Sequence, residues 1–257
     1  MRPIFLSQRP VFLSPHPDDA VLSCGGSIYQ LAENGHRPIV LTLFGGDRAP
    51  HAPLSDFARS LQERWQLGDD APAARREEDR AACDRLGAML IHLPFADAVY
   101  RVDPVSGQAL YASEEAIFGA VRDAGIIDLV AEALRGKLRP IGLENVRVFV
   151  PLTAGQHVDH VITRAAAERL PIDLVYYEDY PYAENPERMQ PVWGTDEWAS
   201  EAIGLSEAAL RAKIEAFICH RSQISTFYRD DDEVAQRLRA YALSVGHGQL
   251  IERYWRR

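Results

Sequence analysis

The chain has 257 residues and a formal net charge of −9, with 47% hydrophobic and 25% charged residues. These proportions are those of an ordinary globular protein and exclude a largely disordered chain. The negative charge and the scattered arginines exclude a nucleic-acid surface, which needs clustered Lys and Arg.

The first predicted element is a buried strand that ends in a polar loop. Residues 11–13 are apolar, and the sequence Ser-Pro-His-Pro-Asp-Asp follows at residues 14–19. The two prolines restrict the backbone on either side of His16 and remove two amide donors, so the loop is stiff. A stiff loop that carries one imidazole and two carboxylates suits a metal ion.

The segments after this loop predict a parallel sheet. Residues 22–33 have a helical pattern, and residues 38–44 are a nearly continuous apolar run typical of a strand buried on both faces. Residues 47–74 show little periodicity and are expected to be mobile or partly helical. A strand, a helix and a strand in succession form a βαβ unit.

Further elements follow in the same alternation. Helices are predicted over residues 75–86 and 126–138, a short strand over residues 89–94, and a loop over residues 103–115. A buried strand over residues 146–152 then ends in a second polar loop. The helix and strand after that loop are predicted over residues 161–170 and 173–178.

The last part of the chain predicts a cap and further helices. Residues 181–200 are rich in Pro, Trp and Glu and are expected to form a surface loop or cap. Helices are expected from residue 206 and around residues 233–243, with a final strand over residues 249–255. Three aromatic residues of the cap could form a lid that stacks on a sugar, although packing is their commoner role: Tyr182, Trp193 and Trp198.

This order of elements predicts one α/β domain with a mostly parallel, doubly wound sheet. The domain is expected to span residues 1–257, with the site-bearing core over about residues 1–180 and the substrate cap and C-terminal helices over about residues 181–257. Ligands bind such sheets outside the carboxyl ends of the strands. Both polar loops lie at such ends.

The two polar loops together supply the ligands of a catalytic metal. Zinc in a catalytic site takes three protein ligands and keeps one position for water. His16 and Asp19 from the first loop and His160 from the second are the candidates. Asp18, next to a ligand, is placed to take a proton from that water and return it to the leaving group.

Two further residues of the second loop fit the same chemistry. His157 could stabilise the oxyanion of a tetrahedral intermediate, and Asp159 could orient that imidazole and help to keep it protonated. Taken separately, each loop has a plainer interpretation. A histidine at a strand end is usually a hydrogen-bonded loop residue, and Asp18 or Asp19 could be a helix N-cap.

Three motifs, in the same order and spacing, resemble the PIG-L/LmbE family of zinc-dependent N-acetylglucosaminyl deacetylases. The first is the His-Pro-Asp-Asp loop at residues 16–19, and the last is the His-x-Asp-His loop at residues 157–160. Between them, residues 75–87 match the family's R-x-x-E-x-x-x-A-x-x-x-L-G helix. One departure is Ala20, where many members of the family have Glu.

The resemblance implies a Rossmann-like fold, zinc or another divalent transition metal as cofactor, and metal ligands at His16, Asp19 and His160. It also implies that Arg75 and Asp97 bind sugar hydroxyls. For Arg75, an ion pair with Glu78 or Asp79 on the helix surface is equally plausible. For Asp97, a turn residue is the somewhat better interpretation.

The implied activity is hydrolysis of an N-acetyl group on an N-acetylglucosamine-type glycoside, a small-molecule partner. One alternative is an amidase that cleaves a larger acyl or conjugate amide with the same site. A second alternative is a non-catalytic sugar-binding protein on the same scaffold. The sequence does not determine the oligomeric state.

The remaining signals concern the compartment and the other histidines. Three well-separated cysteines without a C-x-x-C pair favour a reduced compartment, and no segment has the apolar length of a signal peptide or a membrane span. We therefore expect a cytoplasmic protein without a membrane partner. Five histidines match no ligand spacing and are expected to be solvated or hydrogen-bonded: His36, His51, His92, His220 and His247.

Overall fold

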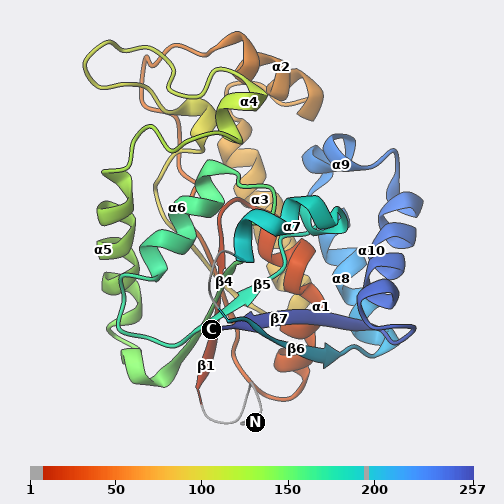
Figure 1. Ribbon diagram of the computed structural model, residues 1–257. Helices are drawn as coiled ribbons and strands as arrows, with labels where there is room; N and C mark the ends of the chain where they lie inside the picture. Colours follow the sequence, from red (N-terminus) through yellow and green to blue (C-terminus); the bar gives the residue numbers. More distant parts are fainter. Residues whose placement is uncertain (1–7, 194–196) are drawn as a thin grey trace.

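The computed structural model describes residues 8–193 and 197–257 and contains a seven-stranded sheet (Figure 1). The strand order is β3-β2-β1-β4-β5-β7-β6; β1 to β5 are parallel, and β7 is antiparallel to both of its neighbours. The strands are β1 (Arg9–Ser14), β2 (Ile39–Thr42), β3 (Met89–His92), β4 (Val146–Pro151), β5 (Leu174–Tyr177), β6 (Ala199–Gly204) and β7 (Ile251–Arg256).

The helices connect these strands and cover both faces of the sheet. The α-helices are α1 (Asp19–Glu33), α2 (Asp56–Trp65), α3 (Ala71–Leu86), α4 (Glu114–Ile117), α5 (Ile126–Leu138), α6 (Val158–Ala167), α7 (Pro186–Trp193), α8 (Glu207–Ile218), α9 (Arg221–Phe227) and α10 (Asp231–Val245). Short 3-10 helices are η1 (Ala98–Tyr100), η2 (Leu143–Asn145) and η3 (Tyr182–Glu184).

The alternation of side chains along the buried strands divides the core into two layers. Val11 and Leu13 of β1 pack under α5 and α6, whereas Phe12 faces α1, α3 and α8 on the other side. Figure 1 shows these two groups of helices on opposite sides of the sheet. A third, smaller core joins α2, α4 and η1 above the carboxyl ends of the strands.

The chain direction places the two polar loops side by side. From β1 the chain runs outward through β2 and β3, and it then returns to the other side of β1 to form β4 and β5. The strand order therefore reverses between β1 and β4, which is where ligands bind in sheets of this kind. The loops after β1 and β4 both lie at this switch point.

The predicted α/β class, with a mostly parallel doubly wound sheet in a single domain, is confirmed. The region over residues 47–74 is partly helical, as expected, since it contains α2 and the start of α3. Residues 181–200, expected to be a loop or cap, contain η3, α7 and the start of the edge strand β6. The exposed residues of β6 carry no apolar run, so no local pattern indicates a strand there.

The predicted aromatic lid does not form as a group. Tyr182 lies beside the site. The Trp198 ring instead packs edge-on against Tyr176, with their centroids 5.0 Å apart, in the core layer that contains α5 and α6. The side chain of Trp193 lies outside the part of the chain that the structure describes. Within the described ranges, no helix combines the length and the apolar character needed to cross a membrane.

Candidate metal centre

The loop after β1 is tied down by its own polar groups. The Ser14 hydroxyl donates to the His16 carbonyl oxygen at 2.7 Å and accepts from the Ala20 amide at 3.0 Å. Asp19 Oδ2 accepts from the His16 amide at 2.8 Å. Asp18 occupies the N-cap position of α1 with a φ of 125°, yet its side chain makes no capping hydrogen bond. This strained conformation, costing on the order of 1–3 kcal/mol, leaves the Asp18 carboxylate for another role.

The loop after β4 forms the N-terminus of α6. His157 is the N-cap residue, and its Nδ1 accepts from the Asp159 amide at 3.2 Å. In a neutral imidazole the proton therefore lies on Nε2, which is left as a hydrogen-bond donor. Burial, and then the charge of neighbouring His16, lowers the pKa of His157 well below its ordinary value. His160 follows in the first turn of the helix.

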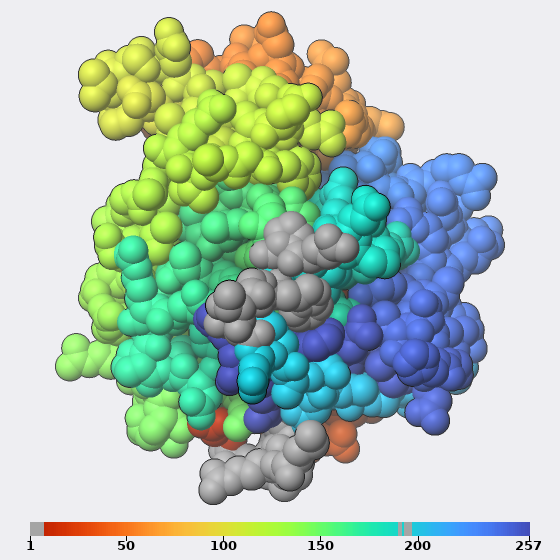
Figure 2. All heavy atoms as spheres, viewed as in Figure 1, coloured from red at the N-terminus to blue at the C-terminus, as the bar shows by residue number. Residues whose placement is uncertain are grey.

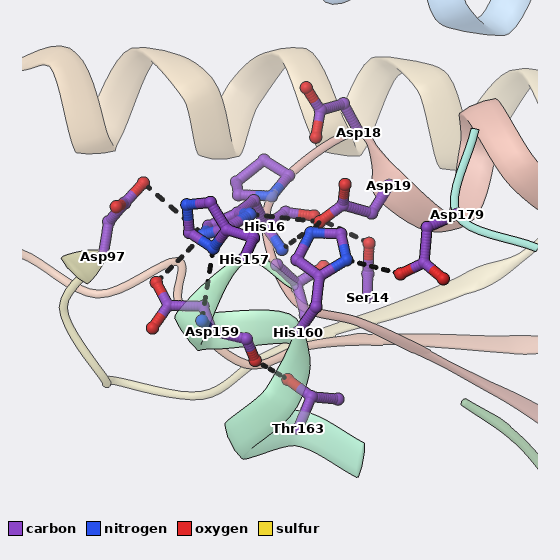
Figure 3. A network of polar contacts seen from close by, with 12 residues as sticks. Ser14, His16, Asp18, Asp19, Asp97, His157, Asp159, His160, Thr163 and Asp179 are labelled. Atoms are coloured by element: carbon purple, nitrogen blue, oxygen red, sulfur yellow. Dashed lines mark hydrogen bonds and ion pairs between the residues drawn. The ribbon is translucent and has the colours of Figure 1, made fainter. Parts of the chain in front are cut away.

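The two loops bring three of the predicted residues into contact (Figure 3). Asp19 Oδ2 lies 3.1 Å from His16 Nδ1 and 3.3 Å from His160 Nε2. Ligand atoms bound tetrahedrally to zinc at about 2.0–2.1 Å are separated by about 3.3 Å. The two measured separations fit a metal ion held between these side chains.

The outward nitrogens of both imidazoles contact buried carboxylates. His16 Nε2 lies 3.0 Å from Asp159 Oδ2, and His160 Nδ1 lies 2.6 Å from Asp179 Oδ1. A carboxylate on the far nitrogen fixes the ring and strengthens the near nitrogen as a ligand. Burial would lower the pKa of His160, but Asp19 and Asp179 raise it to about 9. The surroundings thus favour positive charge at this point.

Buried side chains in this region could hold a metal ion in more than one grouping. Ring nitrogens of His16, His157 and His160 lie within 4.8 Å of one another, and so do ligand atoms of His16, Asp97 and Asp159. All of these side chains are buried. The site therefore has more possible ligand atoms than one ion needs. The hydrogen bonds that each side chain already makes indicate which of them are available to a metal.

Asp159 contacts different partners from those expected. Its carboxylate faces His16 and forms an ion pair with Arg101 at 2.6 Å, while only its backbone amide contacts His157. Burial alone would raise the pKa of Asp159, but Arg101 and His16 hold it below its usual value. Asp159 therefore stays charged and orients His16 directly.

Two residues of this network, Arg101 and Asp179, were not predicted to contact the metal ligands. Asp179 follows β5, so its place at the carboxyl edge of the sheet is a signal that could have identified it. Arg101 follows η1 and pairs with a carboxylate 58 positions away, and nothing in the local sequence indicates that contact. Ion pairs of this kind depend on the folded arrangement.

Asp18, Arg75 and Asp97 form one wall of the site. The Arg75 guanidinium lies 3.3 Å from Asp97 Oδ2 and 3.9 Å from Asp18 Oδ2. Arg75 is buried and forms no ion pair with Glu78 or Asp79, so the surface interpretation of this arginine is wrong. Burial raises the pKa of Asp18 well above its ordinary value, and the adjacent Asp19 adds to this.

Asp97 has two roles in the fold. Its Oδ1 accepts from the Val99 amide at 3.2 Å and caps η1, as a turn residue would. Its Oδ2 points to Arg75 and lies 3.8 Å from His16 Nε2. The expectation of a turn residue is thus correct for one oxygen, and the other oxygen faces the site.

These side chains enclose a small cavity, which we call the inner pocket, of about 100 Å³. Its lining includes the charged residues and histidines His16, Asp18, Asp19, Arg75, Asp97 and His157. On its open side the inner pocket meets a larger cavity of about 460 Å³, the outer groove, which lies between α2, α4, η3 and α9. The two cavities share five lining residues: Leu61, Ile117, Tyr182, Thr226 and Phe227.

Comparison with known proteins finds one family and several similar deacetylases. The family described as GlcNAc-PI de-N-acetylase (PIG-L) matches residues 11–170, a range that contains both polar loops. The 2′-N-acetylparomamine deacetylase of Niallia circulans is 31% identical over 198 residues, 71% of this chain and 71% of that protein.

Solved structures of deacetylases share the fold. A zinc-inhibited form of the teicoplanin deacetylase Orf2 has a TM-score of 0.82 and 28% identity, covering 96% of this chain and 97% of that one. The A40926 pseudoaglycone deacetylase Dbv21 has a TM-score of 0.76 and 28% identity, covering 98% and 97%.

Proposed function

The chain belongs to the GlcNAc-PI de-N-acetylase family and is a deacetylase, and from this we propose that it removes the N-acetyl group of an N-acetylglucosamine-type glycoside with the help of zinc. The observation that carries the proposal is the contact of Asp19 with both His16 and His160, beside the carboxylate of Asp18, which makes no capping hydrogen bond. The relatives named above act on acetylated sugar-containing compounds, which supports an amino sugar as the group that reacts.

We infer that His16, Asp19 and His160 hold the metal and that His157 does not. His16 and His160 each have the far nitrogen against a carboxylate and the near nitrogen against Asp19. His157 uses Nδ1 to accept from the helix backbone, so its Nε2 carries a proton and is unsuited to a ligand. A divalent metal bound at the three ligands supplies Lewis-acid chemistry, acidifying water and polarising a carbonyl oxygen.

Of the remaining residues, Asp18 moves the proton and His157 stabilises the charge that develops. Asp18 takes a proton from the attacking water as the water oxygen bonds to the acetyl carbonyl carbon. His157 donates a hydrogen bond from Nε2 to the carbonyl oxygen, which gains negative charge as its double bond opens. Asp18 then gives its proton to the amide nitrogen, and the C–N bond breaks to release acetate and the free amine.

Arg75 and Asp97 are proposed to bind the hydroxyl groups of the sugar. Both line the inner pocket, where the guanidinium can donate and the carboxylate can accept. The inner pocket has a volume of about 100 Å³ and is closed by the polar residues of the site. Its size supports an acetyl group as the acyl group over a long acyl chain.

The test combines a metal assay with acetate release. Purified protein is stripped of metal, reloaded with Zn²⁺ and supplied with methyl N-acetylglucosaminide. We expect one metal ion per chain and zinc-dependent release of acetate and free amine in equal amounts.

The control is the Asp19→Ala variant, which removes a ligand. We expect it to lose both the metal and the activity while keeping its far-UV circular dichroism. Zinc-loaded, folded protein that releases no acetate from any N-acetylated sugar would contradict the proposal. Full activity in protein without bound metal would contradict the assigned role of the ion.

A further inference from the structure

The outer groove has no assigned role in the chemistry above, although it continues the inner pocket outward. It is formed by side chains from α2, α4, η3, α7 and α9, segments far apart in the sequence. Figure 2 shows the yellow-green, cyan and blue segments that carry α4, α7 and α9 adjoining on one face of the molecule. A substrate whose sugar lies in the inner pocket can therefore extend outward along this groove.

The groove is lined by four half-buried aromatic rings. Phe118 and Tyr182 lie edge to face with centroids 5.7 Å apart, and Tyr182 and Phe227 are arranged in the same way at 6.4 Å. Phe57 completes the lining from α2. Aromatic faces of this kind favour planar or apolar ligands.

The position of Tyr182 depends on a glycine in the loop after β4. A Cβ atom added at Gly155 would lie 3.0–3.1 Å from the Tyr182 ring. The ring therefore occupies space that only glycine leaves open, between the metal ligand His160, at a centroid distance of 5.9 Å, and Phe118. Tyr182 stands at the junction of the two cavities and joins the aromatic lining to the site.

The charged residues of the groove are mainly arginines. The Arg188 guanidinium lies over the rings of Phe118 and Tyr182, at 5.8 and 5.5 Å from their centroids. Neither Arg188 nor Arg64 forms an ion pair with a carboxylate of the described residues. Arg237 is paired with Glu184, which leaves Glu114 as the acidic residue of the lining without such a pair.

We propose that the outer groove binds the aglycone of the substrate and selects an aromatic aglycone that is neutral or anionic. This inference rests on the proposed function, because it assumes that the sugar occupies the inner pocket. The lining carries three arginines and two glutamates, so a polycationic aminoglycoside would place its ammonium groups in a groove of net positive charge, which is unfavourable. An aromatic aglycone would bury its rings against the four aromatic side chains.

The chemistry of the two cavities supports the aglycone, and not the acyl group, as the occupant of the groove. The inner pocket carries the groups that match sugar hydroxyls, Arg75 and Asp97, and neither of them lines the groove. With the sugar held there, its glycosidic oxygen can point outward to the groove while the acetyl group faces Asp18.

The experiment compares kcat/KM of the zinc-loaded enzyme for three N-acetylated compounds. They are methyl N-acetylglucosaminide, its 4-carboxyphenyl analogue and 2′-N-acetylparomamine, which carries several ammonium groups. We expect the aryl glycoside to be at least about 10-fold better than the methyl glycoside, and the aminoglycoside to be the poorest. The same series with N-butanoyl in place of N-acetyl separates an effect of the acyl group from one of the aglycone.

Variants locate the effect in the groove. Phe57→Ala and Phe227→Ala should each lower the ratio of aryl to methyl kcat/KM by about 3- to 10-fold. Arg64→Gln should lower the ratio for the anionic aryl glycoside, while Arg59→Gln should leave it unchanged. Arg59 lies on the same helix but outside the groove, where it faces Asp56 at 3.7 Å.

Each result has one meaning. The aminoglycoside as the best compound, a better N-butanoyl than N-acetyl substrate, or equal effects of the groove variants on aryl and methyl glycosides would overturn the aglycone assignment and leave the deacetylase function standing. No hydrolysis of any of the compounds by zinc-loaded protein would overturn the proposed function and the aglycone assignment with it.

Discussion

The inner pocket and the outer groove adjoin each other, yet their side chains are held in different ways. In the inner pocket the histidines, the carboxylates and the arginine are buried, and each contacts a second polar group, as His16 does with Asp159 at 3.0 Å. In the outer groove the rings of Phe57, Phe118 and Phe227 are half-buried and come from helices outside the sheet. The side chains of the inner pocket are held by loops at the ends of strands. Those of the outer groove are held by packing between helices that lie outside the sheet.

This difference assigns separate tasks to the two regions. Metal and proton chemistry needs side chains held within a fraction of an ångström, and loops at the ends of buried strands can provide this. Selection of the aglycone depends on the shape and charge of a surface that can change without disturbing the sheet. Variants should therefore fall into two classes: those that change metal binding or kcat, and those that change the preference for the aglycone.

The largest effect is expected from the two adjacent carboxylates of the first loop. Asp18→Asn should lower kcat by about 10²- to 10⁴-fold with zinc content unchanged, because the base is lost and the ligands remain. Asp19→Asn should instead lower the affinity for zinc. The measurements are steady-state kinetics and metal content of the same samples. If both variants lost metal equally, the division of roles between Asp18 and Asp19 would be wrong.

A smaller effect is expected when the partner of a ligand is changed. Asp179→Asn should weaken zinc binding by about 10- to 100-fold, with much of kcat restored at saturating zinc, because His160 loses its charged partner. The measurement is a competition titration with a chelator.

Glu178→Gln is the matched control for this variant, since Glu178 is the neighbouring buried carboxylate. It faces away from the site and bonds to Tyr241 Oη at 2.6 Å and Trp255 Nε1 at 2.8 Å. Equal weakening of zinc binding by both variants would show that the effect is one of general structure.

A separate effect, on the stability of the fold, concerns His220, the N-cap residue of α9. It was expected to be solvated or hydrogen-bonded, but it is buried, and neither ring nitrogen has a hydrogen-bond partner among the described residues. Burial lowers the pKa of His220 to about 4. The unfolded chain, with an ordinary histidine, binds this proton at higher pH than the folded chain does.

His220 should therefore contribute to the acid sensitivity of the fold. The contribution of the neutral, buried His220 to the free energy of unfolding is fully present above about pH 6.5. It is lost as the pH falls toward 4, by about 3 kcal/mol in total. Denaturant unfolding of metal-free protein at pH 7.5 and 4.5 should show a smaller loss in His220→Phe than in the wild type. His36→Phe, at a position that is not buried, is the control. An unchanged pH dependence in His220→Phe would contradict the prediction.

The parts of the fold that follow from local pattern were predictable. The helix over residues 126–138 has the predicted bounds, and the apolar runs at residues 11–13 and 146–152 became central strands. The edge strand β6 was missed because its residues are mostly exposed and form no apolar face. Only its pairing with β7 defines it as a strand. The small helix α9 was missed for a related reason, since it is short and packs across α2.

The sequence by itself determined which residue types stand at the ends of β1 and β4, because prolines and apolar runs fix strand ends locally. It thereby determined the candidate ligands, including His16 and His160. Only the tertiary structure decided which carboxylate contacts which imidazole. Asp159 contacts His16, 143 positions away in the sequence, and Asp179 contacts His160. These contacts depend on how α6 and the loop after β5 pack at the edge of the sheet, which no local pattern encodes.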